Sequence, residues 1–83
     1  LEQNYPNPFN PSTVINFSLP SAGNVVLVVY NSVGEKVATL VNGALSAGSH
    51  SVRFKGDNLP SGLYFYKLQA DGISFTRKMV LSK

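Results

Sequence analysis

The sequence predicts an all-β fold, a sandwich of six to seven short antiparallel strands in one domain of 83 residues. Two observations predict it. Apolar and polar residues alternate over short stretches, as they do in strands with one buried face. Turn-forming Gly, Pro, Asn and Asp separate these stretches at intervals of about 8–12 residues, and no stretch keeps a helical period over several turns. Strands of this length and spacing are typical of immunoglobulin-like β-sandwiches.

The chain opens with a lead-in, residues 1–12, that is rich in Pro and Asn. Its Pro and Asn residues are Asn4, Pro6, Asn7, Pro8, Asn10 and Pro11. Proline removes a ladder donor and keeps the preceding residue extended. We therefore expect an extended segment, ordered or tethered, that suits a junction with a preceding domain or adds a seventh strand. The sandwich itself is expected over residues 13–83.

The first strands follow from residue pattern and turn chemistry. Residues 14–19 alternate, which predicts a half-buried strand. Residues 25–30 are apolar on both faces and rich in Val, which favours a central strand. A hairpin turn over residues 31–34 leads to a strand at residues 36–41. Residues 42–48 are small and loop-like, with room for one helical turn at 44–46.

The second half repeats this organisation with clearer signals. Residues 50–55 alternate again, and residues 56–62 are the strongest loop signal of the chain. An aromatic strand is expected over residues 63–70. Asp71-Gly72 is a dipeptide favoured in two-residue hairpin turns, so residues 73–81 return as the last strand.

Charge and hydropathy exclude two classes of partner. The formal net charge is +3, and the whole excess lies in residues 67–83, which is too little for a nucleic-acid interface. The longest apolar run, residues 25–30, cannot span a bilayer. The chain does not begin with Met and shows no signal peptide, so we expect a module of a longer precursor.

No constellation for catalysis or for metal or cofactor binding is evident. The chain has no Cys and a single His, His50. His50 alternates with Val52 and Phe54, which favours a structural histidine on a buried or half-buried face. The four carboxylates show no spacing that predicts an acid–base pair. We therefore expect neither enzymatic activity nor a cofactor.

The consecutive aromatics Tyr64, Phe65 and Tyr66 leave two interpretations open. Tyr64 and Tyr66 share one face of their strand. That face belongs either to the core, which a small domain needs for stability, or to an exposed platform that stacks on sugar rings. Phe75 on the facing strand is expected to be a cross-strand neighbour of this patch.

Three segments in series resemble one family. They are residues 1–11 followed by 13–17, residues 28–31 with Gly34 and Val37, and residues 59–64 leading through Gly72 to 77–81. Together they resemble the type A C-terminal sorting domains of the type IX secretion system over essentially the whole chain. The positions that carry the family's motifs are Asn4, Pro6, Asn7, Pro8, Tyr30, Gly34, Pro60, Gly62, Tyr64 and Gly72.

This resemblance implies a non-catalytic module at the C-terminus of an exported bacterial protein, with an immunoglobulin-like fold. The cargo would precede it on the same precursor. Its partners would be the type IX machinery, which carries cargo through the periplasm and across the outer membrane, and a sortase-like peptidase. The cargo would end secreted or attached to the cell surface. The sequence departs from the family at Phe54, where Trp is frequent, and at Ser82, where an apolar residue is frequent.

The last strand has the strongest claim to direct recognition. The residues expected to form the sorting signal are Arg77, Lys78, Met79, Val80, Leu81 and Lys83. A terminal strand can be recognised by strand addition, or it can simply complete the sandwich with a solvated basic rim. Two other functions remain open: an immunoglobulin-like carbohydrate-binding or adhesive module, and a flagellar-hook-capping module.

Overall fold

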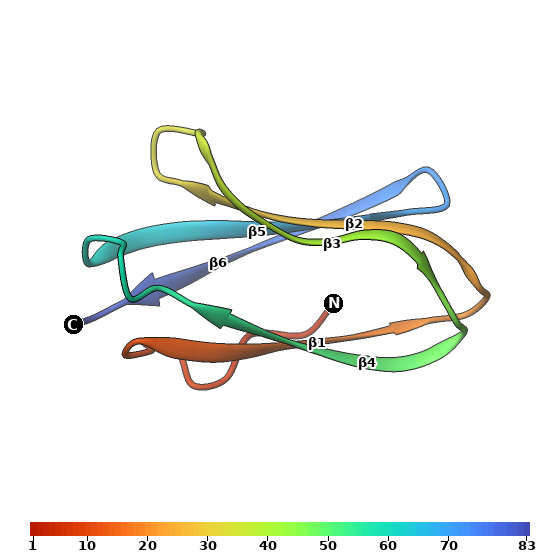
Figure 1. Cartoon of the computed structure of the whole chain (residues 1–83), viewed down its shortest axis with the longest axis horizontal. Helices are drawn as coiled ribbons and strands as arrows, with labels where there is room; N and C mark the ends of the chain where they lie inside the picture. The colour runs from red at the N-terminus through yellow and green to blue at the C-terminus, as the bar shows by residue number, and fades with distance from the viewer.

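The computed structural model describes residues 1–83, and its six strands form two layers (Figure 1). The strands are β1 (Ser12–Leu19), β2 (Gly23–Asn31), β3 (Lys36–Leu45), β4 (Gly48–Lys55), β5 (Gly62–Ala70) and β6 (Ile73–Leu81). One layer is an antiparallel sheet in the order β3-β2-β5-β6, and the other pairs β1 with β4. This architecture confirms the predicted all-β sandwich. No helix in it is long and apolar enough to cross a membrane.

The alternation in the sequence decides which face of each strand is buried. In β1 the side chains of Ile15, Phe17 and Leu19 face the core, and the residues between them are more exposed. β2 lies between β3 and β5 and buries the consecutive residues Val28 and Val29. Burial on both faces is what a central strand requires.

β3 is longer than expected, which corrects one prediction. The segment expected to be a loop at residues 42–48, with a helical turn at 44–46, instead continues the strand as far as Leu45. The register explains the difference, because Leu45 pairs with Gly23 at the start of β2. Pairing with β2 thus imposes strand geometry on a segment whose own composition does not favour it.

Two hairpin turns have the backbone that their residues predict. Between β2 and β3, Gly34 has a φ of 88°, and the Asn31 Oδ1 accepts from the Glu35 N–H at 2.9 Å. Between β5 and β6, Asp71 and Gly72 have φ values of 52° and 74°. Positive φ at both positions is the type I′ turn that joins two strands through two residues.

The core lies between the two layers and includes a residue of the lead-in. Its buried side chains are Phe9, Ile15, Phe17, Leu19, Val25, Leu27, Val29, Phe54, Tyr64, Tyr66, Leu68, Met79 and Leu81. The Phe9 ring meets that of Phe54 edge-on, with the ring centroids 5.9 Å apart. The lead-in is therefore packed into the sandwich and is not a free tether.

Candidate functional site

The candidate site is β6 with the residues that follow it, where the sequence predicts the sorting signal. Its first six residues are exposed, and its side chains alternate between core and solvent only from Met79 onward. Arg77 and Lys78 are exposed, whereas Met79 and Leu81 are only 0% and 1% exposed. Val80 between them is 39% exposed. In the folded domain, only some of the predicted recognition residues are therefore accessible to a partner.

Residues of the lead-in run beside the outer edge of β6. Phe9 forms a parallel bridge with Leu81. Its N–H donates to the Val80 carbonyl at 2.9 Å, and its own carbonyl accepts from the Ser82 N–H at 2.9 Å. The Asn7 Oδ1 accepts from the Val80 N–H at 3.0 Å. This end of the β6 edge is already paired, so a partner strand can add there only by displacing the lead-in.

The contacts between lead-in and β6 continue as far as Arg77. Gln3 Nε2 donates to the Lys78 carbonyl at 2.8 Å, and Arg77 Nε donates to the Leu1 carbonyl at 2.8 Å. Beside these bonds lies an open depression of about 360 Å³ lined by Gln3, Phe65, Thr76, Arg77 and Lys78. Two of its lining side chains are cationic and none is acidic. It thus presents positive charge and hydrogen-bond donors to solvent.

The hydroxyl of Tyr66 in β5 joins the start of the lead-in to the four-stranded sheet. It accepts from the Asn4 N–H at 2.8 Å and donates to the Glu2 carbonyl at 2.7 Å. Burial raises the pKa of Tyr66 above its ordinary value of 10.0, while the hydrogen bond from Asn4 and the charge of Arg77 act in the opposite direction. The phenol therefore keeps its proton, and both hydrogen bonds, at neutral pH.

Two buried polar residues hold the lead-in against β1. Asn4, 2% exposed, donates through Nδ2 to Thr13 Oγ1 at 3.0 Å and to the Pro6 carbonyl at 3.1 Å. The Thr13 hydroxyl donates to the same carbonyl at 2.9 Å. Pro8 stays exposed. No buried side-chain nitrogen or oxygen lacks a partner, so this polar cluster stabilises the lead-in without leaving groups unsatisfied.

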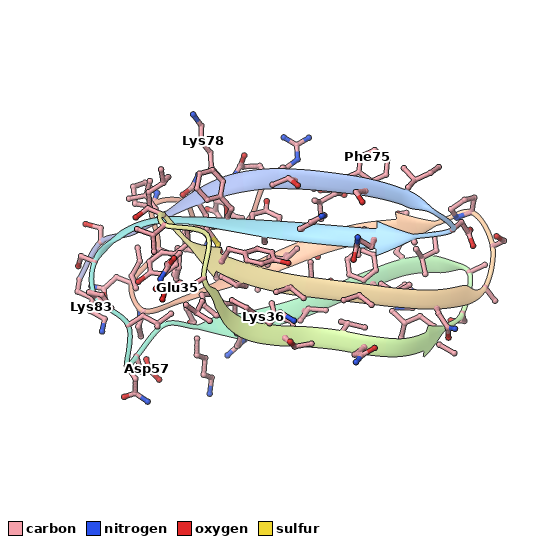
Figure 2. The ribbon with its side chains drawn as sticks, turned by 90° about the horizontal axis from the view of Figure 1, so that it is seen from above. Glu35, Lys36, Asp57, Phe75, Lys78 and Lys83 are labelled. Atoms are coloured by element: carbon pink, nitrogen blue, oxygen red, sulfur yellow. The ribbon has the colours of Figure 1, made fainter.

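The loop before β5 holds the end of the chain. The Lys83 N–H donates to Ser61 Oγ at 3.0 Å, and its Nζ donates to the Asp57 carbonyl at 2.6 Å. Figure 2 shows Lys83 and Asp57 at the same end of the sandwich, while Lys78 projects from the edge of β6. The last cation is thus held apart from the two cations in the middle of the strand.

The remaining motif residues lie outside β6 and have structural surroundings. The Pro60 carbonyl accepts from the buried Tyr64 hydroxyl at 2.7 Å. Gly62 and Gly72 have φ values of 153° and 74°. Tyr30 is half-buried near the end of β2. These positions shape the loops and turns around the strand and do not touch the depression.

The burial of Tyr64 and Tyr66 decides between the two interpretations of the aromatic strand. They are 3% and 0% exposed, so their shared face belongs to the core and cannot stack on a sugar. The register places Leu68 directly opposite Phe75 and Arg77 directly opposite Tyr66. Phe75 is therefore a diagonal neighbour of Tyr66 on the same face, not its direct partner.

His50 has the structural role that the sequence predicts. It is half-buried, and its ring stacks on that of Phe17 with centroids 5.5 Å apart. Its Nε2 lies 2.7 Å from the Ser46 carbonyl oxygen. No group of three or more His, Asp or Glu side chains is placed to hold a metal ion.

Sequence reasoning missed Phe9 and Gln3 as partners of the last strand. Phe9 is a large apolar residue in a segment without alternation, and that signal alone indicates a possible core contact. Nothing in the sequence marks Gln3, whose side chain reaches a carbonyl 75 positions away.

Comparison with protein families agrees with this geometry. A family model described as a secretion system C-terminal sorting domain matches residues 3–82, which include most of the lead-in and all of β6. A search of curated proteins found no match. The sandwich fold, confirmed independently of the motifs, is the one that the resemblance implies. The chain belongs to the family of C-terminal sorting domains of the type IX secretion system, which mark a cargo protein for export.

Proposed function

We propose that the type IX machinery recognises this domain through the exposed cations of β6, and that a sortase-like peptidase then separates it from its cargo. The family assignment supplies the cargo precursor and recognition by the machinery. The observation that carries the finer proposal is that Arg77 and Lys78 stand exposed beside a depression without acidic groups. The cargo, carried through the periplasm and across the outer membrane, ends secreted or attached to the cell surface.

The roles of the recognition residues divide by burial. Arg77, Lys78 and the side chain of Val80 can touch a partner of the folded domain. Met79 and Leu81 act indirectly, because their buried side chains hold β6 on the core. Lys83 contributes a cation at the end of the sandwich, where the Asp57 carbonyl already fixes it.

The contacts of the lead-in support cleavage before Leu1. The Leu1 carbonyl accepts from Arg77 Nε at 2.8 Å, the Glu2 N–H donates to the Asn16 carbonyl at 2.9 Å, and the residues after them bond β1, β5 and β6. A cut within residues 1–11 would remove groups that the fold uses, whereas a cut before Leu1 leaves the domain intact. The peptidase therefore acts on the chain that precedes the packed lead-in.

A reporter that carries residues 1–83 at its C-terminus tests recognition in a host with type IX secretion. With Arg77→Gln and Lys78→Gln together, we expect surface delivery to fall at least tenfold and the reporter to accumulate in the periplasm. The matched control is Arg53→Gln with Lys55→Gln, which removes the same charge from exposed positions of β4. This control should be exported normally.

Two outcomes would contradict the proposal. Normal delivery of the Arg77→Gln, Lys78→Gln reporter would show that charge on β6 is not what the machinery reads. Normal delivery after deletion of residues 78–83 would remove the last strand altogether as the signal. Because that deletion also removes Met79 and Leu81 from the core, circular dichroism of the purified variants separates loss of recognition from loss of folding.

A further inference from the structure

The first half of β6 carries two large apolar side chains that are exposed although they lie on the core side of the sheet. Phe75 is 52% exposed and Ile73 is 55% exposed. Phe75 is directly opposite Leu68, which is 3% exposed, and Ile73 is opposite Ala70. Directly opposite residues of antiparallel strands share a face. Both side chains therefore belong to the face that packs against the second layer, and about half of each is left uncovered there.

The lead-in closes this side of the sandwich over only half of its length. It covers β6 from Leu81 back to Arg77, whose Nε donates to the Leu1 carbonyl. On the other side, Glu2 bonds Asn16 of β1. Figure 1 shows the N-terminus between the two layers, near the middle of the long axis. Phe75 and Ile73 lie on the part of β6 before Arg77, which is the last β6 residue that Leu1 contacts.

The direction of the lead-in indicates where the preceding chain runs. It is parallel to β6, as the Phe9–Leu81 bridge shows, and antiparallel to β1, as the Tyr5–Val14 bridge shows. Continuing it backwards from Leu1 moves past Arg77 toward Phe75, along the second half of β1. The path leads over the uncovered side chains.

The backbone of β1 offers pairing groups along that same path. Val14 and Asn16 bond the lead-in through groups that point away from β4. The period of two in a strand places the N–H and C=O of Ser18 on the same edge. Ser18 is exposed, and none of the backbone hydrogen bonds outside the strand ladders involves it, so this edge is open to a further strand residue.

We propose that the precursor segment directly before Leu1 continues the lead-in as a strand that pairs with Ser18 and covers Phe75 and Ile73. About four residues reach this far at roughly 3.3 Å of rise per residue. Leu1 packs against the core, and strand residues alternate, so the second residue before Leu1 also faces inward and is apolar. The inference rests on the proposed function in that a sorting domain has cargo chain before it. Its covalent attachment gives the segment a high effective concentration at this site.

Cysteine accessibility in the purified precursor tests the inference. The domain contains no cysteine, so Phe75→Cys gives a site whose reaction with N-ethylmaleimide is followed by mass spectrometry of the peptide that contains it. The native precursor is compared with one in which the four residues before Leu1 are replaced by Gly-Ser-Gly-Ser. We expect modification of position 75 to be at least tenfold slower in the native precursor. Val33→Cys, at a 77% exposed turn position, should react equally in both.

A second measurement keeps Phe75 in place, since its replacement removes part of the surface to be covered. Amide exchange of Ser18 should be at least tenfold slower in the native precursor than in the Gly-Ser precursor. Equal rates at position 75 and at Ser18 would overturn the inference. Protection that appears only at high protein concentration, or only with outer-membrane proteins added, would also overturn it in favour of a second copy or a secretion component. Both measurements use purified precursor, so they remain decisive even if the export proposal fails.

Discussion

The two halves of β6 have the same strand geometry and opposite surroundings. In the second half, Met79 and Leu81 are fully buried, and the lead-in pairs with the backbone. In the first half, Phe75 and Ile73 face the same side and remain half exposed. The difference comes from a segment more than sixty positions away in the sequence, not from β6 itself. A strand's burial thus depends on what lies across from it as much as on its own pattern.

The largest effect is expected when Phe9 is replaced, because its ring is what makes the second half of β6 different from the first. Phe9→Ala should lower the free energy of unfolding by about 3–5 kcal/mol, because a buried aromatic ring leaves a cavity beside Phe54. Urea denaturation of the 83-residue chain measures this. In hydrogen exchange of Phe9→Ala, the Val80 and Ser82 amides should exchange as fast as the amides in the first half of β6. Tyr5→Ala, at a 77% exposed lead-in position, is the control and should change stability by less than about 0.5 kcal/mol.

An intermediate effect is expected where Tyr66 holds the start of the lead-in. Tyr66→Phe should cost about 1–3 kcal/mol, because the buried Asn4 N–H loses its acceptor. The cost should also depend on pH. Burial raises the pKa of Tyr66 in the folded state, so the stability linked to its protonated form is fully present below the unfolded-state pKa of about 10. That stability is lost as the pH rises through the folded-state pKa.

Urea denaturation of both proteins from pH 7 to pH 11 checks this sign. The difference in unfolding free energy between the native chain and Tyr66→Phe should be constant up to about pH 9, one unit below the ordinary tyrosine pKa, and should shrink above it. A difference that grows with rising pH would contradict the assignment of the hydroxyl as a protonated, buried donor.

The smallest effect is expected in the first half of β6, at Phe75. Phe75→Ser in the 83-residue chain should change the free energy of unfolding by no more than about 0.5 kcal/mol, since a half-exposed edge position contributes little. Met79→Ala, on the same face of the same strand, should cost about 2–5 kcal/mol. A loss at Phe75 close to that at Met79 would mean that the two halves are equally packed in solution.

The sequence predicts the strands and turns of this fold because their signals are local. The alternation of Ile15, Phe17 and Leu19 and the Asp71-Gly72 turn each depend on a few neighbouring residues. The extension of β3 to Leu45 and the register of Phe75 depend on partner strands. The sequence predicts recognition by residues 77–81 and Lys83 as one group, and only the structure separates the exposed Arg77 and Lys78 from the buried Met79 and Leu81.

The bridge between Phe9 and Leu81 joins positions near the two ends of the sequence. Bringing together residues so far apart in sequence costs more loop-closure entropy than forming a hairpin, so this contact forms after the local hairpins. A polypeptide that ends before Leu81 can still assemble the β2–β3 hairpin and the β1–β4 pair, and its lead-in can still bond β1, but Phe9 has no strand partner. Closure of the domain therefore waits for its last strand, because Phe9 is held in the core only when β6 is in place.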